Sequence, residues 1–288
     1  MALASMSEIF ERMARNGQEF WEVVLADDMD ERQVSREASM AKMLTTWQAM
    51  QDAADSYTGR KRSVSGLVGG DGMKMRQYTF RGCAMTGGYV SEVIAEALSM
   101  AESNACMRRI VAAPTAGACG VLPAVLLPLC KYEELTQHQL LEALYVAAGI
   151  GSIIAYKASI AGASGGCQAE IGTASAMAAG ALVALRGGEG EQIGHAVAMA
   201  LKNLMGLVCD PVAGLVEVPC VKRNVIGAMD ALSAAQMALA GIESRVPPDQ
   251  VLDATAEVGQ SLPHTLRETG KGGLAATPFG LEYAPKEP

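Results

Sequence analysis

The chain has 288 residues, of which 50% are hydrophobic and 19% charged, a composition typical of a globular protein and not of a disordered one. Lys and Arg number 23 against 31 Asp and Glu, which gives a formal net charge of −8. With only the short basic run 60–62, we expect no nucleic-acid binding. Aromatic residues make up only 5%, which argues against a β-sandwich or barrel and favours helices.

The first 57 residues are charged and amphipathic. Ser5 and Glu8 fit a capping box, and apolar residues between Met40 and Ala54 recur at helical spacing. We expect two helices here, joined near 27–30.

A basic, glycine-rich loop follows at 59–72, and amphipathic helices then alternate with Gly/Ala/Pro-rich turns to the end of the chain. Thr136 with Gln139 forms a second capping-box pattern, and Pro247–Asp249 predicts another helix start. No alternating strand pattern, repeat or linker interrupts this order. The prediction is one all-α domain over residues 1–288, with the helices of 1–57 packed on a core of 58–288.

Three long uncharged stretches have to be considered as membrane spans: 110–130, 143–156 and 171–185. A span needs roughly 20 apolar residues. The first stretch is interrupted by prolines and glycines, and the others are too short, so all three read as core segments. Glu8, Glu11 and Arg12 stand where a signal peptide would be apolar. We therefore expect a cytoplasmic protein with no membrane partner.

The cysteines and histidines restrict the chemistry. Seven cysteines are an odd number, too sparse for a secreted disulfide scaffold, and none forms a CxxC pair. In a reducing cytosol they are free thiols or metal ligands. The three histidines lie in ordinary surroundings, and phosphate-loop, zinc-protease and serine-hydrolase motifs are absent.

Four glycine-rich turns with at most one charged residue each stand out, each leading into an apolar helix: 63–72, 113–120, 159–168 and 208–214. Such turns can leave backbone N–H groups free at helix N-termini, which suits a carboxylate or phosphate. The alternative is that the glycines only allow close helix packing. Cys167, Cys209 and Cys220 lie in or beside these turns, although an isolated cysteine is more often a small buried apolar residue.

Several long segments match one family in the same order. They are AAPTAGACG (112–120), SGGCQAEIGTASAMAAG (164–180), GLVCDPVAGLVEVPCVKRN (206–224), LRETGKGGLAATP (266–278) and SGLVGGDGMK (65–74). The chain thereby resembles, over essentially its whole length, the α chain of two-subunit iron–sulfur L-serine dehydratases.

The resemblance implies that Cys167, Cys209 and Cys220 ligate a [4Fe-4S] cluster. Three thiolates leave one iron with an open position, which makes the cluster a Lewis acid for the hydroxyl group of L-serine. The implied products are pyruvate and ammonia, formed in amino-acid catabolism and usable for gluconeogenesis. The family's Ser-His-Thr motif is absent from these residues, so a separate β chain is the implied partner.

The resemblance also carries over a substrate site and leaves the base open. The implied substrate-binding residues are Ser65, Gly66, Gly69, Gly70, Asn104, Thr115, Gly117, Arg223 and Arg267. Each arginine could clamp a carboxylate or, equally, form an ion pair between helices. The candidate bases are Lys74, Glu170 and Asp210, and the sequence does not choose among them.

Further expectations concern three other cysteines and two positions at which the chain differs from the family's usual residues. Cys106 and Cys130 read as core thiols, whereas the turn of Cys119 is expected to face the substrate. Lys157 and Ala161 replace the family's usual Asn and Ser, which would put a cation beside the cluster. Two alternatives stay open: a related cluster-dependent L-cysteine desulfidase, and a non-catalytic scaffold holding a structural cluster or zinc.

Overall fold

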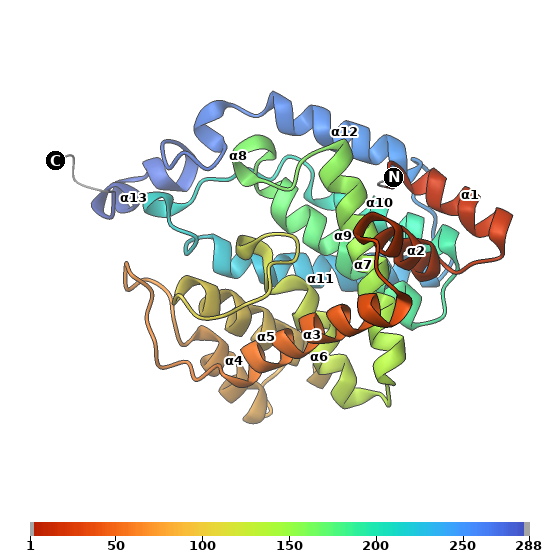
Figure 1. The fold of residues 1–288 in the computed structure, drawn as a ribbon. Helices are drawn as coiled ribbons and strands as arrows, with labels where there is room; N and C mark the ends of the chain where they lie inside the picture. The colour runs from red at the N-terminus through yellow and green to blue at the C-terminus, as the bar shows by residue number, and fades with distance from the viewer. Residues whose placement is uncertain (1–2, 285–288) are drawn as a thin grey trace.

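The computed structural model describes residues 3–284, and the regular secondary structure of this part of the chain is helical, apart from one isolated bridge between Cys209 and Arg267. The predicted all-α class is confirmed, while the first two and last four residues of the predicted domain lie outside the described range. Figure 1 shows the helices in chain order. Their bounds are α1 Met6–Asn16, α2 Phe20–Arg32, α3 Arg36–Asp55, α4 Asp71–Phe80, α5 Gly87–Ala105, η1 Ala116–Ala118, α6 Val121–Tyr132, α7 Gln137–Lys157, α8 Gly162–Gly165, η2 Gln168–Gly172, α9 Thr173–Leu185, α10 Gly190–Leu204, η3 Val212–Gly214, α11 Cys220–Leu239, α12 Pro248–Ser261, η4 His264–Leu266, η5 Gly273–Ala276 and α13 Pro278–Glu282.

The N-terminal region forms three helices where two were predicted. The expected break at 27–30 is wrong, because those residues lie inside α2. The chain breaks instead at Gly17 and Gln33, which both adopt left-handed backbone conformations with φ of 62° and 52°. The predicted capping serine is correct, since the Ser5 hydroxyl accepts a hydrogen bond from the Glu8 amide at 3.0 Å.

The start of α1 is tied to α12. The Asp249 carboxylate, which follows the predicted Pro248 start of α12, accepts hydrogen bonds from the amides of Met6 and Ser7 at 3.0 and 2.9 Å. A carboxylate at a helix N-terminus satisfies free N–H groups and opposes the positive end of the helix dipole. One aspartate therefore joins elements more than 240 residues apart.

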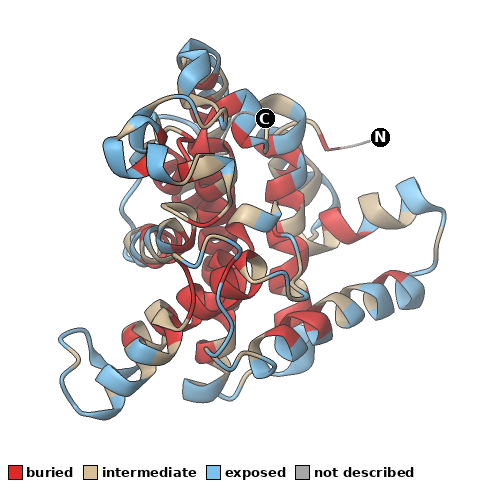
Figure 2. Cartoon of the chain, turned by 90° about the vertical axis from the view of Figure 1, so that its left-hand side faces the viewer, coloured by how far each residue is buried: buried red, intermediate tan, exposed pale blue. Residues whose placement is uncertain are grey.

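Helix α9 lies in the middle of the bundle and packs against α7, α10 and α11. Its residues are mostly small and almost all buried. Figure 2 shows that buried residues gather in the middle of the fold. At Gly180 a Cβ atom would lie 2.2 Å from Ile150 Cδ1 of α7, so glycine is required for the two helices to approach this closely.

Helix α7 is, within residues 3–284, the one helix long and apolar enough to cross a membrane. Two-thirds of its most apolar window is buried inside the fold, against α9 and α2. Such burial is what a core helix shows. This agrees with the reading of 143–156 as a core segment.

Candidate functional site

The structure brings Cys167, Cys209 and Cys220 together from three separate turns. Cys167 precedes η2, Cys209 follows α10, and Cys220 is the first residue of α11. All three are free thiols, and Cys167 and Cys209 are almost fully buried. Burial raises the pKa of Cys167 to about 11 and of Cys220 to about 12. Burial also raises the pKa of Cys209, and the charges of the other two sulfur atoms raise it further, so the three thiols lie within electrostatic range of one another.

Gln168 joins the turn of Cys167 to the turn before Cys209. Its backbone amide donates to the Leu207 carbonyl at 3.0 Å, and its side-chain oxygen accepts from the Gly206 amide at 2.7 Å. The side-chain nitrogen donates to the Thr255 carbonyl of α12 at 2.8 Å. Because Gln168 is only 2% exposed, this network is shielded from water and fixes the position of Cys167.

Arg223, on the first turn of α11, connects all three cysteine-bearing segments. It donates to the Val208 carbonyl at 2.7 Å and to the Asp210 carboxylate at 2.8 Å, and it lies close enough to Cys167 for the two groups to interact electrostatically. Of the two alternatives for this arginine, the structure shows the ion pair between segments. Its guanidinium is already engaged by the protein.

Arg267 holds Cys209 through the backbone and keeps an unpaired side-chain donor. The Cys209 amide donates to the Leu266 carbonyl, and the Cys209 carbonyl accepts from the Glu268 amide, both at 2.8 Å. The Arg267 Nε atom is buried and has no hydrogen-bond partner within residues 3–284. Of the two candidate arginines, Arg267 is therefore the one with a free donor for a ligand.

Glu170 is the candidate base that lies beside the thiols. A Cβ atom at Gly162 would stand 3.0 Å from Glu170 Oε2 and 3.1 Å from both Cys209 Sγ and Glu268 Oε2. Thr115 donates to Glu170 Oε1 at 2.6 Å, which joins one predicted substrate residue to this carboxylate. Burial raises the pKa of Glu170, and the nearby charge of Glu268 raises it further.

The other two candidate bases have different surroundings. Asp210 is buried and saturated, because it pairs with Arg223 and also accepts from the Leu274 amide at 2.9 Å. Lys74 is 70% exposed and pairs with Asp71 on the same helix at 2.8 Å. The structure does not bring Lys74 to the thiols by any contact.

The glycine-rich loop at 59–72 leads into α4 as expected, but the N-terminus of this helix is not free for a ligand. The Glu102 carboxylate of α5 accepts hydrogen bonds from the amides of Gly70 and Asp71 at 3.0 and 2.7 Å. A side chain of the protein therefore takes the amides that, in one of the two alternatives, would bind an external anion. Gly66, Gly69 and Gly70 all have positive φ, and a Cβ at Gly69 would lie 2.3 Å from the Lys61 carbonyl oxygen.

Asn224 joins the turn at 113–120 to Cys220. It is fully buried, its amide nitrogen donates to the carbonyls of Gly117 and Cys220 at 2.8 and 3.0 Å, and its oxygen accepts from the Gly120 amide at 2.8 Å. Gly117 thereby lies between α11 and Glu170. The predicted substrate residue Asn104 lies at the C-terminal turn of α5, next to the helix segment that carries Glu102.

Sequence reasoning missed Glu102, Gln168, Glu217, Asn224 and Glu268. Only Asn224 carries a local signal, its position one helical turn after Cys220.

The remaining cysteines are not part of this arrangement. Cys119 is fully buried and donates to the Met100 carbonyl at 3.7 Å, so its thiol faces α5, while Thr115 of the same turn contacts Glu170. Cys130 donates to the Leu126 carbonyl within its own helix, and Cys83 is exposed. The cation of Lys157 lies 3.4 Å from Asp249 and from Asp253, so it is directed at α12.

Three cysteine thiols are a donor set of the kind that suits an iron–sulfur cluster. A zinc ion requires its sulfur ligands within roughly 2.3 Å of one point. Within residues 3–284 no three His, Cys, Asp or Glu side chains are arranged to hold one ion. In a cluster each thiolate binds a different iron, so the sulfur atoms need only surround a common volume. Gly162 packs closely against this group, since a Cβ atom there would stand 3.1 Å from Cys209 Sγ.

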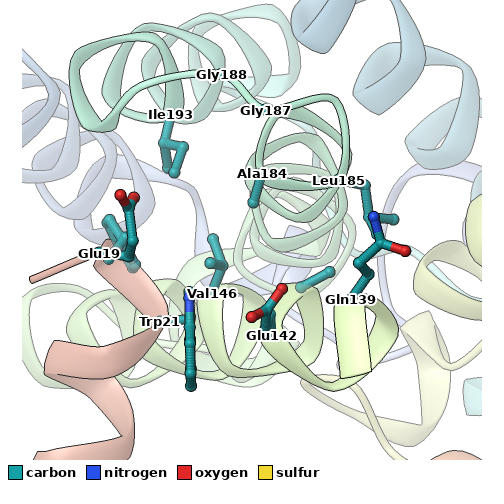
Figure 3. A pocket seen from close by; sticks show the side chains of 12 residues that line it. Glu19, Trp21, Gln139, Glu142, Val146, Ala184, Leu185, Gly187, Gly188 and Ile193 are labelled. Atoms are coloured by element: carbon teal, nitrogen blue, oxygen red, sulfur yellow. The ribbon is translucent and has the colours of Figure 1, made fainter. Parts of the chain in front are cut away.

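A separate cavity of about 360 Å³ lies between α2, α7 and the turn after α9 (Figure 3). Trp21 and the carboxylates of Glu19 and Glu142 point toward it. Glu142 is paired with His138 at 2.9 Å and Glu19 caps α2, so both carboxylates have partners within the protein. None of the predicted site residues lines this cavity.

Comparison with known proteins gives one consistent family. The family model "Serine dehydratase alpha chain" matches residues 15–275. The "Probable L-serine dehydratase, alpha chain" of Bacillus subtilis is 46% identical over 265 residues, which cover 92% of this chain and 88% of that protein. The "L-serine dehydratase, alpha chain" of Peptoniphilus asaccharolyticus is 38% identical over 96% of both chains. The Escherichia coli "L-serine dehydratase 1" is 44% identical over 62% of this chain, but the match covers only 40% of that longer protein.

Proposed function

Since the chain belongs to the serine dehydratase alpha chain family, we propose that it is the α subunit of an iron–sulfur-dependent L-serine dehydratase. Such an enzyme is a lyase that converts L-serine to pyruvate and ammonia. The observation that carries the proposal is the meeting of Cys167, Cys209 and Cys220, three thiols that come from separate turns and interact electrostatically.

The proposed cofactor is a [4Fe-4S] cluster held by these three cysteines. When bound, it would supply a Lewis-acidic iron that makes the β-hydroxyl of serine a better leaving group. Because burial holds the pKa of each thiol high, the site binds metal only by releasing protons, and loading should be favoured at higher pH.

The chain's own residues have distinct proposed roles in the reaction. The buried, unpaired Nε of Arg267 would donate to the substrate carboxylate, whereas Arg223 and Asp210 hold the turns in place. Glu170 would accept the α-proton, because it is the one candidate base beside Cys209. Loss of that proton and of the hydroxyl group leaves aminoacrylate, which tautomerises and hydrolyses to pyruvate and ammonia.

The assembly and location are part of the same proposal. The longer E. coli relative carries, in one chain, a large segment outside the match, and two of the relatives above are named as α chains. We propose that a separate β chain supplies the missing part of the active site. We also propose a cytoplasmic location, since seven free thiols suit a reducing compartment.

The test is anaerobic purification followed by iron, sulfide and zinc analysis, with pyruvate release from L-serine measured with and without the β chain. We expect about four irons per chain. We also expect activity on L-serine that exceeds activity on L-cysteine and L-threonine. One zinc and no iron would favour the scaffold alternative, and a preference for L-cysteine would favour the desulfidase alternative.

A further inference from the structure

The glycine-rich loop at 59–72 is held at both ends by buried carboxylates. At the α4 end, Glu102 is 1% exposed and accepts from the amides of Gly70 and Asp71 and from the Tyr57 hydroxyl. At the other end, Glu217 is 5% exposed and accepts from the Ser63 hydroxyl at 2.5 Å and from the hydroxyl and amide of Ser65. The loop is therefore hydrogen-bonded to two carboxylates from other parts of the chain, Glu102 of α5 and Glu217 of the turn before α11.

Glu217 also lies in the turn that precedes α11, three residues before Cys220. Its carbonyl accepts the Val221 amide at 3.0 Å, in the first turn of α11. Figure 1 shows the loop before α4 and the loop before α11 on the same side of the bundle. A single residue thus contacts the glycine-rich loop through its side chain and the cysteine-bearing helix through its backbone.

The hydrogen-bond partners of Glu217 predict that even replacement by glutamine will weaken its contacts. Within residues 3–284 its side-chain partners are only hydroxyl and amide donors of Ser63 and Ser65, with no Lys or Arg among them. A buried carboxylate without a cation depends on every donor that it accepts from. A glutamine keeps the shape of the side chain but turns one acceptor into a donor facing hydroxyl groups.

The same contacts define what Ser65 can do. Its hydroxyl donates to Glu217 and accepts from the Leu67 amide at 3.1 Å, so its strong hydrogen-bonding capacity is used within the loop. The hydroxyl of this predicted substrate residue is therefore a contact within the loop.

We propose that Glu217 is a positioning residue that fixes the glycine-rich loop relative to the Cys220 turn, so that a small amino-acid substrate is held between them. Glu217 acts through Ser65 and touches no substrate. The inference rests on the proposed function for its kinetic part, while its structural part concerns this chain alone.

The loop contains its own reporter, since the exposed residues Arg60, Lys61 and Arg62 are trypsin sites. Full-length Glu217→Gln and Ser65→Ala variants are digested with trypsin, and cleavage at these sites is timed by mass spectrometry. The control is Asp230→Asn: Asp230 is a buried carboxylate farther along α11 that accepts from Ser175 and Asn203 at 2.6 and 2.7 Å. It has the same chemistry but no contact with the loop.

We expect cleavage at 60–62 to accelerate at least about fivefold in both loop variants and to stay at the wild-type rate in Asp230→Asn. In the iron-loaded enzyme with its β chain, KM for L-serine should rise about tenfold or more while kcat changes less than about threefold. The double variant should resemble Glu217→Gln, because that substitution already alters the acceptor of the Ser65 hydroxyl, whereas Ser63 still donates to Glu217 in Ser65→Ala. Iron content should equal that of the wild type.

Unchanged cleavage, additive effects of the two substitutions, or a loss of kcat with KM unchanged would each overturn the proposal. If the wild-type enzyme does not act on L-serine, the proposed function fails. The trypsin comparison still decides whether Glu217 anchors the loop, so the two failures can be told apart.

Discussion

Replacing Arg223 with methionine tests whether the site is held by a buried ion pair. The side chains of Arg223 and Asp210 are only 14% and 6% exposed. Removing the cation leaves the Asp210 carboxylate buried with one remaining donor, the Leu274 amide. Breaking one partner of a buried pair costs about 3–5 kcal/mol, whereas an exposed pair contributes about 0–1 kcal/mol.

The measurement is urea unfolding of the metal-free chain together with its Tm. A loss of this size should lower the Tm by about 10 °C in a chain of this length. The control is Arg245→Met, whose pair with Glu243 is 85% and 52% exposed and whose loss should change stability by less than about 0.5 kcal/mol. Adding Asp210→Asn to Arg223→Met should recover part of the loss, since the unpaired charge is then gone. If Arg223→Met and Arg245→Met cost the same, the ion pair does not hold the three turns together.

Four further outcomes follow from the site and its surroundings. Cys209→Ala should abolish cluster absorbance and activity, whereas Cys119→Ala should keep the iron and cost about 1 kcal/mol of stability; equal iron loss would refute the ligand assignment. Gly162→Ala should reduce iron content and lower activity about tenfold or more, because its Cβ would lie 3.1 Å from Cys209 Sγ, while Gly172→Ala, whose nearest contact would be 3.8 Å, should match the wild type in both assays. Burial raises the pKa of Asp230 above 3.8, so the folded state holds this proton more tightly than the unfolded state, and the group's contribution to stability is lost as pH rises through the folded pKa. The Tm of Asp230→Asn relative to wild type should therefore increase as the pH rises from about 4, and a constant difference would contradict this. Finally, adding a β chain to the iron-loaded chain should raise pyruvate release, and equal turnover without it would show that the α chain is self-sufficient.

The sequence predicted those features that depend on neighbouring residues. The caps at Ser5 and Thr136 and the Pro248 helix start are local patterns, and the structure contains them. The N-terminal break was misplaced because the acidic run at 27–30 resembles a loop but lies on the surface of α2, where Arg32 pairs with Asp28.

The candidate site could be predicted only in part, because the residues that hold it together are far apart in the sequence. The motifs located the three cysteines, but not the groups that hold their turns. Glu217 and Ser63 are 154 residues apart, and Gln168 and Thr255 are 87 apart. A glutamate within a helix normally indicates a solvated surface, so nothing local marks Glu102 as a buried anchor. Such roles arise from tertiary packing and become visible only when the partners are seen together.

The π-helical turn η2 lies between Cys167 and the core helix α9, and it changes the rotation of one relative to the other. An α-helix advances about 100° per residue, so a turn that contains an additional residue rotates everything before it relative to everything after it. Residues after η2 keep the small-residue face that α9 presents to α7, α10 and α11. Cys167 and Glu170, before and within the turn, lie close enough to Cys209 for their charges to raise the pKa of that thiol, which burial raises most. The direction in which Cys167 and Glu170 point is therefore not tied to the face that α9 packs against its neighbours. Deleting one residue between 168 and 172 would restore regular α-helical geometry and rotate these side chains relative to that face.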